Sequence, residues 1–214
     1  WMTMPPARNA VAGTKNGYCP HCGNGNGICG DGGQWPSDSN YVNAGATPSG
    51  PGSTLIAGSI HQVEIKITAH HKGHFEFSIC EQEISSSTPD AQGCLDQHLL
   101  LRASAQELGI NDCQANDRRP ECQPIDTRHP ERFYLPPGGF SPDGSDNHKI
   151  NLWIPAGLQC DHCTLQWRWW SANSCIPGVD YGCYAEVLSA NGYNPPDWYG
   201  APAACPGGGC TRCA

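Results

Sequence analysis

The segment AHHKGHFEFSIC, residues 69–80, carries three histidines within five positions. Imidazole nitrogens bind transition metals and transfer protons near neutral pH, so this spacing raises the question of a metal site. Apolar and polar residues alternate through 54–80, which predicts strands with one buried and one wet face. This parity puts His71 on the buried face and His70 and His74 on the wet face.

The residues alone leave the role of these histidines open. Gly73 predicts a bulge or tight bend beside His71, where a histidine can equally be a hydrogen-bonded core residue. Exposed polar side chains are the simpler interpretation of the other two. No H-E-x-x-H motif, G-x-S-x-G elbow or P-loop occurs in the sequence. Glu76, Glu81 and Glu83 are interpreted as a solvated face rather than as paired catalytic carboxylates.

Composition narrows the class of partner. The 214 residues carry a formal net charge of −8, and the isoelectric point is about 5.5. Nucleic acids and anionic membranes select basic surfaces, so neither is an expected partner. No apolar run approaches the length that crosses a bilayer.

Cysteine is the strongest compositional signal, with 14 residues in the chain. This density predicts a secreted, extracellular protein with up to seven disulfides. The alternative is structural zinc, because three pairs have C-x-x-C spacing. These pairs are Cys19/Cys22, Cys160/Cys163 and Cys210/Cys213.

The remaining pattern predicts a mainly β protein. Strands are expected within 54–80, 148–158, 163–175 and 184–190, with a short helix within 94–109. The 26 glycines and 19 prolines indicate many turns. We therefore expect one domain over residues 1–214, with a Cys/Pro/Gly-rich tail from about 194. Its fold would be an immunoglobulin/fibronectin-like β-sandwich with long, disulfide-stapled loops.

Four segments, in this order, resemble the lytic polysaccharide monooxygenases, formerly the chitin-binding type-4 domain, and most nearly auxiliary activity family 15. Each motif is modest by itself, but four in register are specific. The segments are MTMPPARN (2–9), ITAHHKGHFEFSIC (67–80), IPAGLQCDHCTLQWRWWSANSC (154–175) and YGCYAEV (181–187).

The resemblance implies a copper site built as a histidine brace. One brace ligand in the family is the N-terminal histidine of the mature chain, and the position of the other corresponds to His71. Ala69 would crowd one axial side of the metal and Tyr181 would occupy the other, with Tyr184 as the alternative if the alignment slips. Asp180 and Cys183 receive no role from the resemblance.

The copper prediction depends on what precedes Trp1. Relatives begin His-Gly a few residues before Pro-Pro-Ala-Arg, so an upstream His-Gly fits the spacing, and we favour that interpretation. The alternatives are a chain processed or expressed two residues short, and a member of the fold that has lost the brace.

With an intact brace, the resemblance implies a secreted copper enzyme that oxidatively cleaves an insoluble β-1,4-linked polysaccharide, chitin or cellulose. Four aromatic residues in expected loops are candidates for stacking on sugar rings, although packing within the loops explains them equally well. They are Trp35, Tyr41, Trp198 and Tyr199.

Two other functions remain open for the same fold. One is a polysaccharide-binding module without a working brace, and the other is an extracellular structural protein that self-assembles into filaments. Oxidation products separate the enzyme from both alternatives. Polysaccharide binding without oxidation favours the module, and concentration-dependent assembly favours the structural protein.

Overall fold

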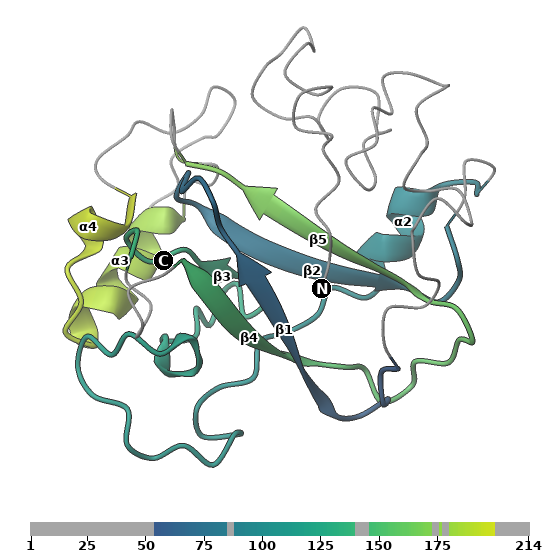
Figure 1. Ribbon diagram of the computed structural model, residues 1–214, viewed down its shortest axis with the longest axis horizontal. Coiled ribbons are helices and arrows are strands. Elements are labelled where there is room, and N and C mark those ends of the chain that lie inside the picture. The colour runs from purple at the N-terminus through teal and green to yellow at the C-terminus, as the bar shows by residue number, and fades with distance from the viewer. Residues whose placement is uncertain (1–53, 85–87, 140–145, 173–175, 177–179, 200–214) are drawn as a thin grey trace, which may run out of the picture. The chain divides into compact units, whose positions relative to one another are not determined.

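The structure is a computed structural model that describes residues 54–84, 88–139, 146–172, 176 and 180–199. Along this part of the chain, two strands are followed by two short helices, three further strands and two more helices (Figure 1). The strands are β1 (Ile60–Lys66), β2 (His74–Cys80), β3 (Phe133–Tyr134), β4 (Asn147–Trp153) and β5 (Thr164–Trp170). The helices are α2 (Ala91–Asp96), η1 (Pro120–Cys122), α3 (Tyr181–Ala190) and α4 (Pro195–Tyr199).

The strands form two sheets. β1 pairs antiparallel with β4 in a register that runs from Ile60 opposite Trp153 to Lys66 opposite Asn147. The second sheet has the order β3-β2-β5, and β2 pairs antiparallel with β3. Alternation accounts for the first sheet, because Val63 and Ile65 of β1 and His148, Ile150 and Leu152 of β4 are buried at every second position.

The chain divides into two compact units, each with a core of its own. The first unit comprises Trp1–Gly58, Phe77–Leu99 and Pro155–Trp167, and the second Ser59–Glu76, Leu100–Ile154 and Arg168–Ala214. In the first unit Cys80, Ile84, Ala91 and Leu95 form a buried cluster. In the second unit an aromatic cluster lies around α3 and α4; its buried members are Tyr134, Tyr181, Tyr184, Leu188, Tyr193 and Trp198.

Within the second unit, side chains of the two sheets pack against each other. The ring of His148 on β4 lies 5.5 Å from that of Phe133 on β3 and 6.5 Å from that of Phe75 on β2. All three side chains are buried. The antiparallel strands and this layer of rings between them confirm the predicted mainly β sandwich.

Two disulfides among the described residues lie in or beside connecting segments, as predicted, and another joins a strand to a helix. Cys113 is joined to Cys122, and Cys160 to Cys163. Cys80–Cys94 links the end of β2 to α2. The Cys160/Cys163 pair is therefore not a zinc knuckle, and the other two C-x-x-C pairs lie outside the described residues.

Two secondary-structure predictions were wrong. Residues 184–190 belong to helix α3 rather than to a strand, because Tyr181, Tyr184 and Leu188 recur at helical spacing and are all buried. The helix expected within 94–109 instead occupies Ala91–Asp96. It begins earlier because the Asp90 carboxylate accepts a hydrogen bond from the Gly93 amide at 3.1 Å and so caps the helix.

The prediction of a wet face on β2 was also wrong. All seven side chains of this strand are buried, including those of His74, Glu76 and Ser78. β2 is the central strand of its sheet, with β3 on one side and β5 on the other. Polar side chains buried in this way need hydrogen-bond partners. The partners of His74 and Glu76 belong to the candidate site.

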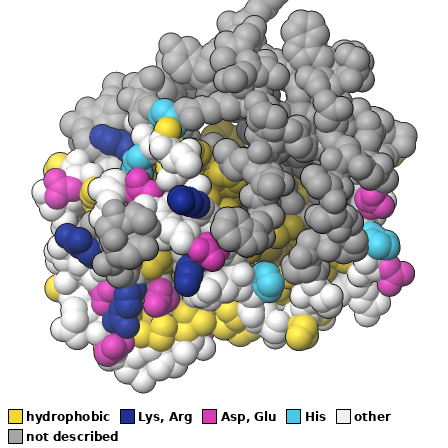
Figure 2. Space-filling view, in the orientation of Figure 1, with side chains coloured by type: hydrophobic (Ala, Val, Ile, Leu, Met, Phe, Trp, Pro, Cys, Tyr) yellow, Lys and Arg dark blue, Asp and Glu magenta, His cyan; other side chains and the backbone are white. Residues whose placement is uncertain are grey.

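The surface carries charged side chains of both signs. On the face shown in Figure 2, acidic and basic side chains are interspersed over the coloured residues rather than gathered by sign. Among the described residues, no helix is long and apolar enough to span a bilayer.

Candidate functional site

The segment that carries His71 makes a sharp bend just before β2. Lys72 and Gly73 have φ values of +54° and +87°, so two successive residues adopt left-handed backbone. The predicted bend at Gly73 is therefore present. A Cβ at Gly73 would lie 2.8 Å from the carbonyl carbon of Trp170, so both the conformation and the space require glycine.

Three successive carbonyls of the bend are held by neighbouring elements. The carbonyl of His71 accepts from the Ala172 amide at 2.9 Å, and that of Gly73 accepts from the Leu135 amide at 2.8 Å. Between them, the Lys72 carbonyl accepts from the indole Nε1 of Trp169 at 2.8 Å. The backbone at His71 is therefore fixed from both sides.

His71 itself is half-buried, and its ring centroid lies 5.6 Å from that of Trp169. Ala69, two residues earlier, is exposed. An imidazole on an anchored bend, next to a small exposed side chain, can serve as a metal ligand with little reorganisation.

His70 has a structural role instead. Its Nδ1 accepts from the Lys72 amide at 3.2 Å, which leaves its Nε2 to donate to the Pro136 carbonyl at 2.7 Å. Both ring nitrogens are thus engaged in holding the bend. The expectation that this side chain is simply exposed was wrong, since it is half-buried.

His74 connects β2 to helix α3. Its Nδ1 is hydrogen-bonded to the hydroxyl of Tyr181, the first residue of α3, and its Nε2 lies 3.0 Å from Oε1 of Glu76. His74 is 2% exposed, Glu76 8% and Tyr181 0%. This hydrogen bond brings Tyr181 to the start of β2. That strand begins at His74, three residues after His71 in the sequence.

Glu76 is the centre of this buried group. Its Oε2 accepts from Nε1 of Trp170 at 2.9 Å, while Nε of Arg132 lies 3.5 Å from Oε1 and Nη1 of Arg168 lies 3.9 Å from Oε2. Burial acts to raise the pKa of Glu76, but the hydrogen bonds from His74 and Trp170 and the charge of Arg132 outweigh it and hold the pKa at about 2.

The protonation state of His74 follows from the same surroundings. Burial lowers its pKa to about 4, against the raising effect of the hydrogen bond to Glu76. The imidazole is therefore neutral at pH 7. With Nε2 donating to the carboxylate, Nδ1 accepts the hydroxyl proton of Tyr181.

A half-exposed cluster adjoins this buried group. Asp180, the N-cap residue of α3, pairs with Nη1 of Arg132 at 3.3 Å and with Nε2 of His129. Nδ1 of His129 lies 3.1 Å from Glu131. Burial acts to raise the pKa of Asp180, but Arg132 and His129 hold it below its usual value. Asp180 thus anchors the start of α3, a role that the sequence did not suggest.

Tyr184, the alternative to Tyr181, points into the aromatic cluster. Its ring stacks on Tyr134 at a centroid distance of 3.8 Å, and its hydroxyl donates to the Pro124 carbonyl at 3.1 Å. Of the two tyrosines, Tyr181 is the one whose hydroxyl meets β2.

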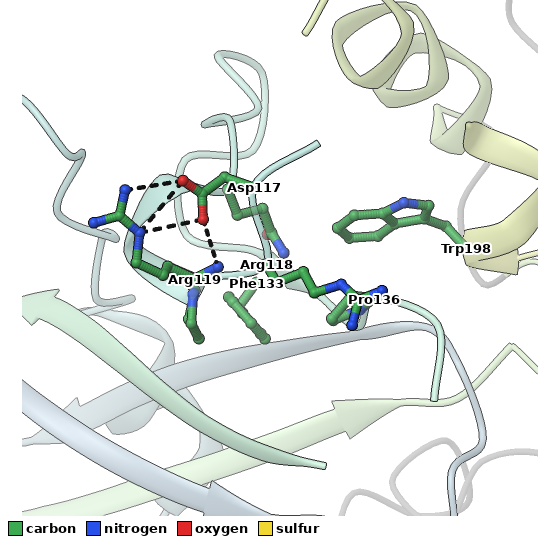
Figure 3. A pocket seen from close by; sticks show the side chains of 8 residues that line it. Asp117, Arg118, Arg119, Phe133, Pro136 and Trp198 are labelled. Carbon is green, nitrogen blue, oxygen red and sulfur yellow. Dashed lines mark hydrogen bonds and ion pairs between the residues drawn. The ribbon is translucent and has the colours of Figure 1, made fainter. Parts of the chain in front are cut away.

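Trp198 is unsuited to stacking on a polysaccharide surface. It is 2% exposed and packs edge-on against Tyr184 and Tyr193. Its indole and Phe133 border a small pocket. The Asp117–Arg119 ion pair lines the other side of this pocket (Figure 3). The burial of Trp198 therefore favours the packing interpretation.

The other three candidate aromatics have no described side chain. Trp35 and Tyr41 lie outside the described residues, and Tyr199 is described only as the last residue of α4. Their proposed role in sugar binding stays a prediction.

Sequence reasoning missed the partners of Tyr181. His74 and Glu76 were assigned to a solvated face, and Arg132 was not singled out. No sequence signal identified Glu76, because a position between Phe75 and Phe77 is also that of a residue on a solvated face; its burial follows from the central place of β2 in the sheet.

Comparison with known proteins identifies relatives of the chain. The family model described as "Lytic polysaccharide mono-oxygenase, cellulose-degrading" matches residues 8–186. A solved structure, a lytic polysaccharide monooxygenase AA15 from Thermobia domestica in the Cu(I) state, is similar at 26% identity and a TM-score of 0.36. The match covers 55% of this chain and 45% of that one. No curated protein matches the sequence.

Proposed function

Because the chain belongs to the lytic polysaccharide monooxygenase family, whose members oxidise polysaccharides with copper, we propose that it is a secreted copper enzyme that cleaves a β-1,4-linked polysaccharide, cellulose or chitin. The observation that supports the proposal is the anchored backbone at His71, the residue that the resemblance assigns as a brace ligand. The disulfides among the described residues support an oxidising, extracellular location.

The donors of this chain fit copper. An imidazole nitrogen is a preferred ligand of copper, and Ala69, which is exposed, would border one axial side of the metal as the family resemblance implies. The other brace nitrogens would come from an N-terminal histidine of the mature protein. When bound, copper would supply the one-electron and oxygen chemistry that attacks a C–H bond of the sugar.

The residues of the chain have a positioning role in this proposal. The hydrogen bonds to the carbonyls of residues 71–73 hold the backbone that carries the His71 ring, so the bend itself need not move when metal binds. Trp169 packs beside that ring and restricts its movement. Tyr181 contributes a phenol held at the start of β2.

The first test is the mass and N-terminal sequence of the native secreted protein, followed by Cu(II) titration. A chain that begins with histidine should bind one copper ion with a nitrogen-rich EPR spectrum. His71→Ala should weaken copper binding at least about 100-fold. His162→Ala, at an exposed histidine, is the matched control and should leave binding unchanged.

The second test is product analysis on cellulose and on chitin with a reductant. Oxidised oligosaccharides from one of them, lost in His71→Ala, are the expected result and identify the substrate. Binding to the polysaccharide without oxidised products would instead support a binding module. Concentration-dependent assembly without polysaccharide binding would support a structural protein.

A further inference from the structure

Tyr181 is held at two points by different groups. Its hydroxyl meets Nδ1 of His74, while the preceding residue, Asp180, is tied by its carboxylate to Arg132 and His129. The side chain and the backbone of this residue are thus both constrained. A buried phenol hydroxyl needs a hydrogen-bond partner in any case, but an apolar or carbonyl neighbourhood would not set that partner beside a buried carboxylate as His74 does.

The direction of the hydroxyl hydrogen bond follows from Glu76. This carboxylate lies within 4 Å of guanidinium nitrogens of Arg132 and Arg168, so it accepts hydrogen bonds and does not donate them. Nε2 of His74 therefore donates to Glu76, and Nδ1 is left as an acceptor. Tyr181 must then donate its proton to His74, which leaves the lone pairs of the phenol oxygen facing elsewhere.

Burying such a polar group is not the most stable solution for a core. Apolar side chains of similar volume stabilise a protein as well as, or better than, a buried ion pair. His74 and Glu76 lie on β2 just after the bend that carries His71, and they connect that strand to Tyr181. Their location indicates a role beyond packing.

We propose that His74 and Glu76 are positioning residues for Tyr181. Together they fix its phenol as a hydrogen-bond donor toward β2 and hold its ring beside the segment of His71. The inference rests on the proposed function in assigning Tyr181 to the copper site, but the contact itself is independent of copper.

Two substitutions at His74 separate this role from packing. The side chain of asparagine reaches about as far as Nδ1 of histidine, and that of glutamine about as far as Nε2. His74→Asn therefore keeps an acceptor for Tyr181 and loses the contact with Glu76. His74→Gln keeps the contact with Glu76 and loses the acceptor.

The test uses the full chain with its native N-terminus. His74→Gln and Tyr181→Phe should shift the Cu(II) EPR parameters in the same way, and the double variant should show no additional shift. His74→Asn should stay closer to the wild type. In His74→Gln and Tyr181→Phe, copper affinity should change less than about threefold, and turnover should fall about tenfold or more at unchanged KM. Wild-type spectra in both His74→Gln and Tyr181→Phe would overturn the proposal.

Absence of copper binding by the wild-type protein would contradict the proposed function. A second measurement then tests the positioning of Tyr181 by His74 without copper. Unfolding midpoints of the metal-free protein are then compared for His74→Gln, Tyr181→Phe and the double variant. Non-additive shifts support the positioning contact. Additive shifts overturn it, whatever the protein does with copper.

Discussion

At the scale of single residues, the most informative feature is a neutral histidine kept beside an ionised carboxylate in the core. His74 accepts from Tyr181 and donates to Glu76, and each of these contacts depends on its protonation state. Protonating His74 would remove its acceptor nitrogen in a site where two guanidinium groups already lie near Glu76. The contact with Tyr181 is therefore sensitive to acid.

This sensitivity predicts how stability depends on pH. The pKa of His74 is about 4 when folded and 6.5 when unfolded, so between these values the unfolded chain binds more protons. The free energy of unfolding should therefore decrease as the pH falls from 6.5 to 4, by about 3 kcal/mol in total. Urea unfolding at a series of pH values measures this slope.

The matched variants are His74→Gln, which should flatten the slope, and His162→Gln, which should not. Glu76, with a folded pKa of about 2, adds a further loss of stability below pH 4.5 in the wild type. An unchanged slope between pH 6.5 and 4 in His74→Gln would contradict the attribution of this pH dependence to His74.

At the scale of elements, the bend before β2 determines where His71 lies. Its two left-handed residues and three anchored carbonyls join β2 to the segments around Trp169, Ala172 and Leu135. A change in the backbone there should move His71 without touching its side chain.

Gly73→Ala tests this point. The added Cβ would be strained by the positive φ and would meet the Trp170 carbonyl, so the free energy of unfolding should drop by about 2 kcal/mol or more. Copper affinity should fall with it. Gly157→Ala is the control, because a Cβ there meets nothing within 4 Å. Equal stability of the two variants would show that the bend is not required.

The same elements show what sequence reasoning could predict. β1 and β4 were predictable because one face of each is buried and the pattern alternates. The bend was predictable from Gly73 alone, whereas the role of His71, which comes from the family motif, stays a prediction. The burial of His74 was not predictable. Its partner Tyr181 lies 107 residues away and begins helix α3, of which residues 184–190 were predicted as a strand.

At the scale of the whole molecule, each unit has a small core, and disulfides supplement it. Cys80–Cys94 closes a loop with a sequence separation of 14 and its first cysteine is fully buried with Ile84, Ala91 and Leu95. Cys160–Cys163 spans a separation of only 3. The two bonds should therefore contribute unequally.

Replacing each pair by alanines measures the difference. Loss of Cys80–Cys94 should cost about 3 kcal/mol of unfolding free energy from loop entropy, with an additional cost for the core atoms removed. Loss of Cys160–Cys163 should cost about 2 kcal/mol or less. Thermal unfolding of the two double variants is the measurement, and a larger loss for Cys160/Cys163 would contradict this ranking.

The net charge of −8 makes a final prediction about the partner of the molecule. Cellulose and chitin carry almost no charge, so binding to them should depend on hydrogen bonds and apolar contacts, which salt screens little. Retention on either polysaccharide should therefore change less than about twofold between 50 and 500 mM NaCl. Double-stranded DNA is the control, because an acidic surface should not retain it at either concentration. A steep loss of polysaccharide binding with salt would instead indicate a charged ligand, and the neutral β-1,4-linked substrate would then be the wrong choice.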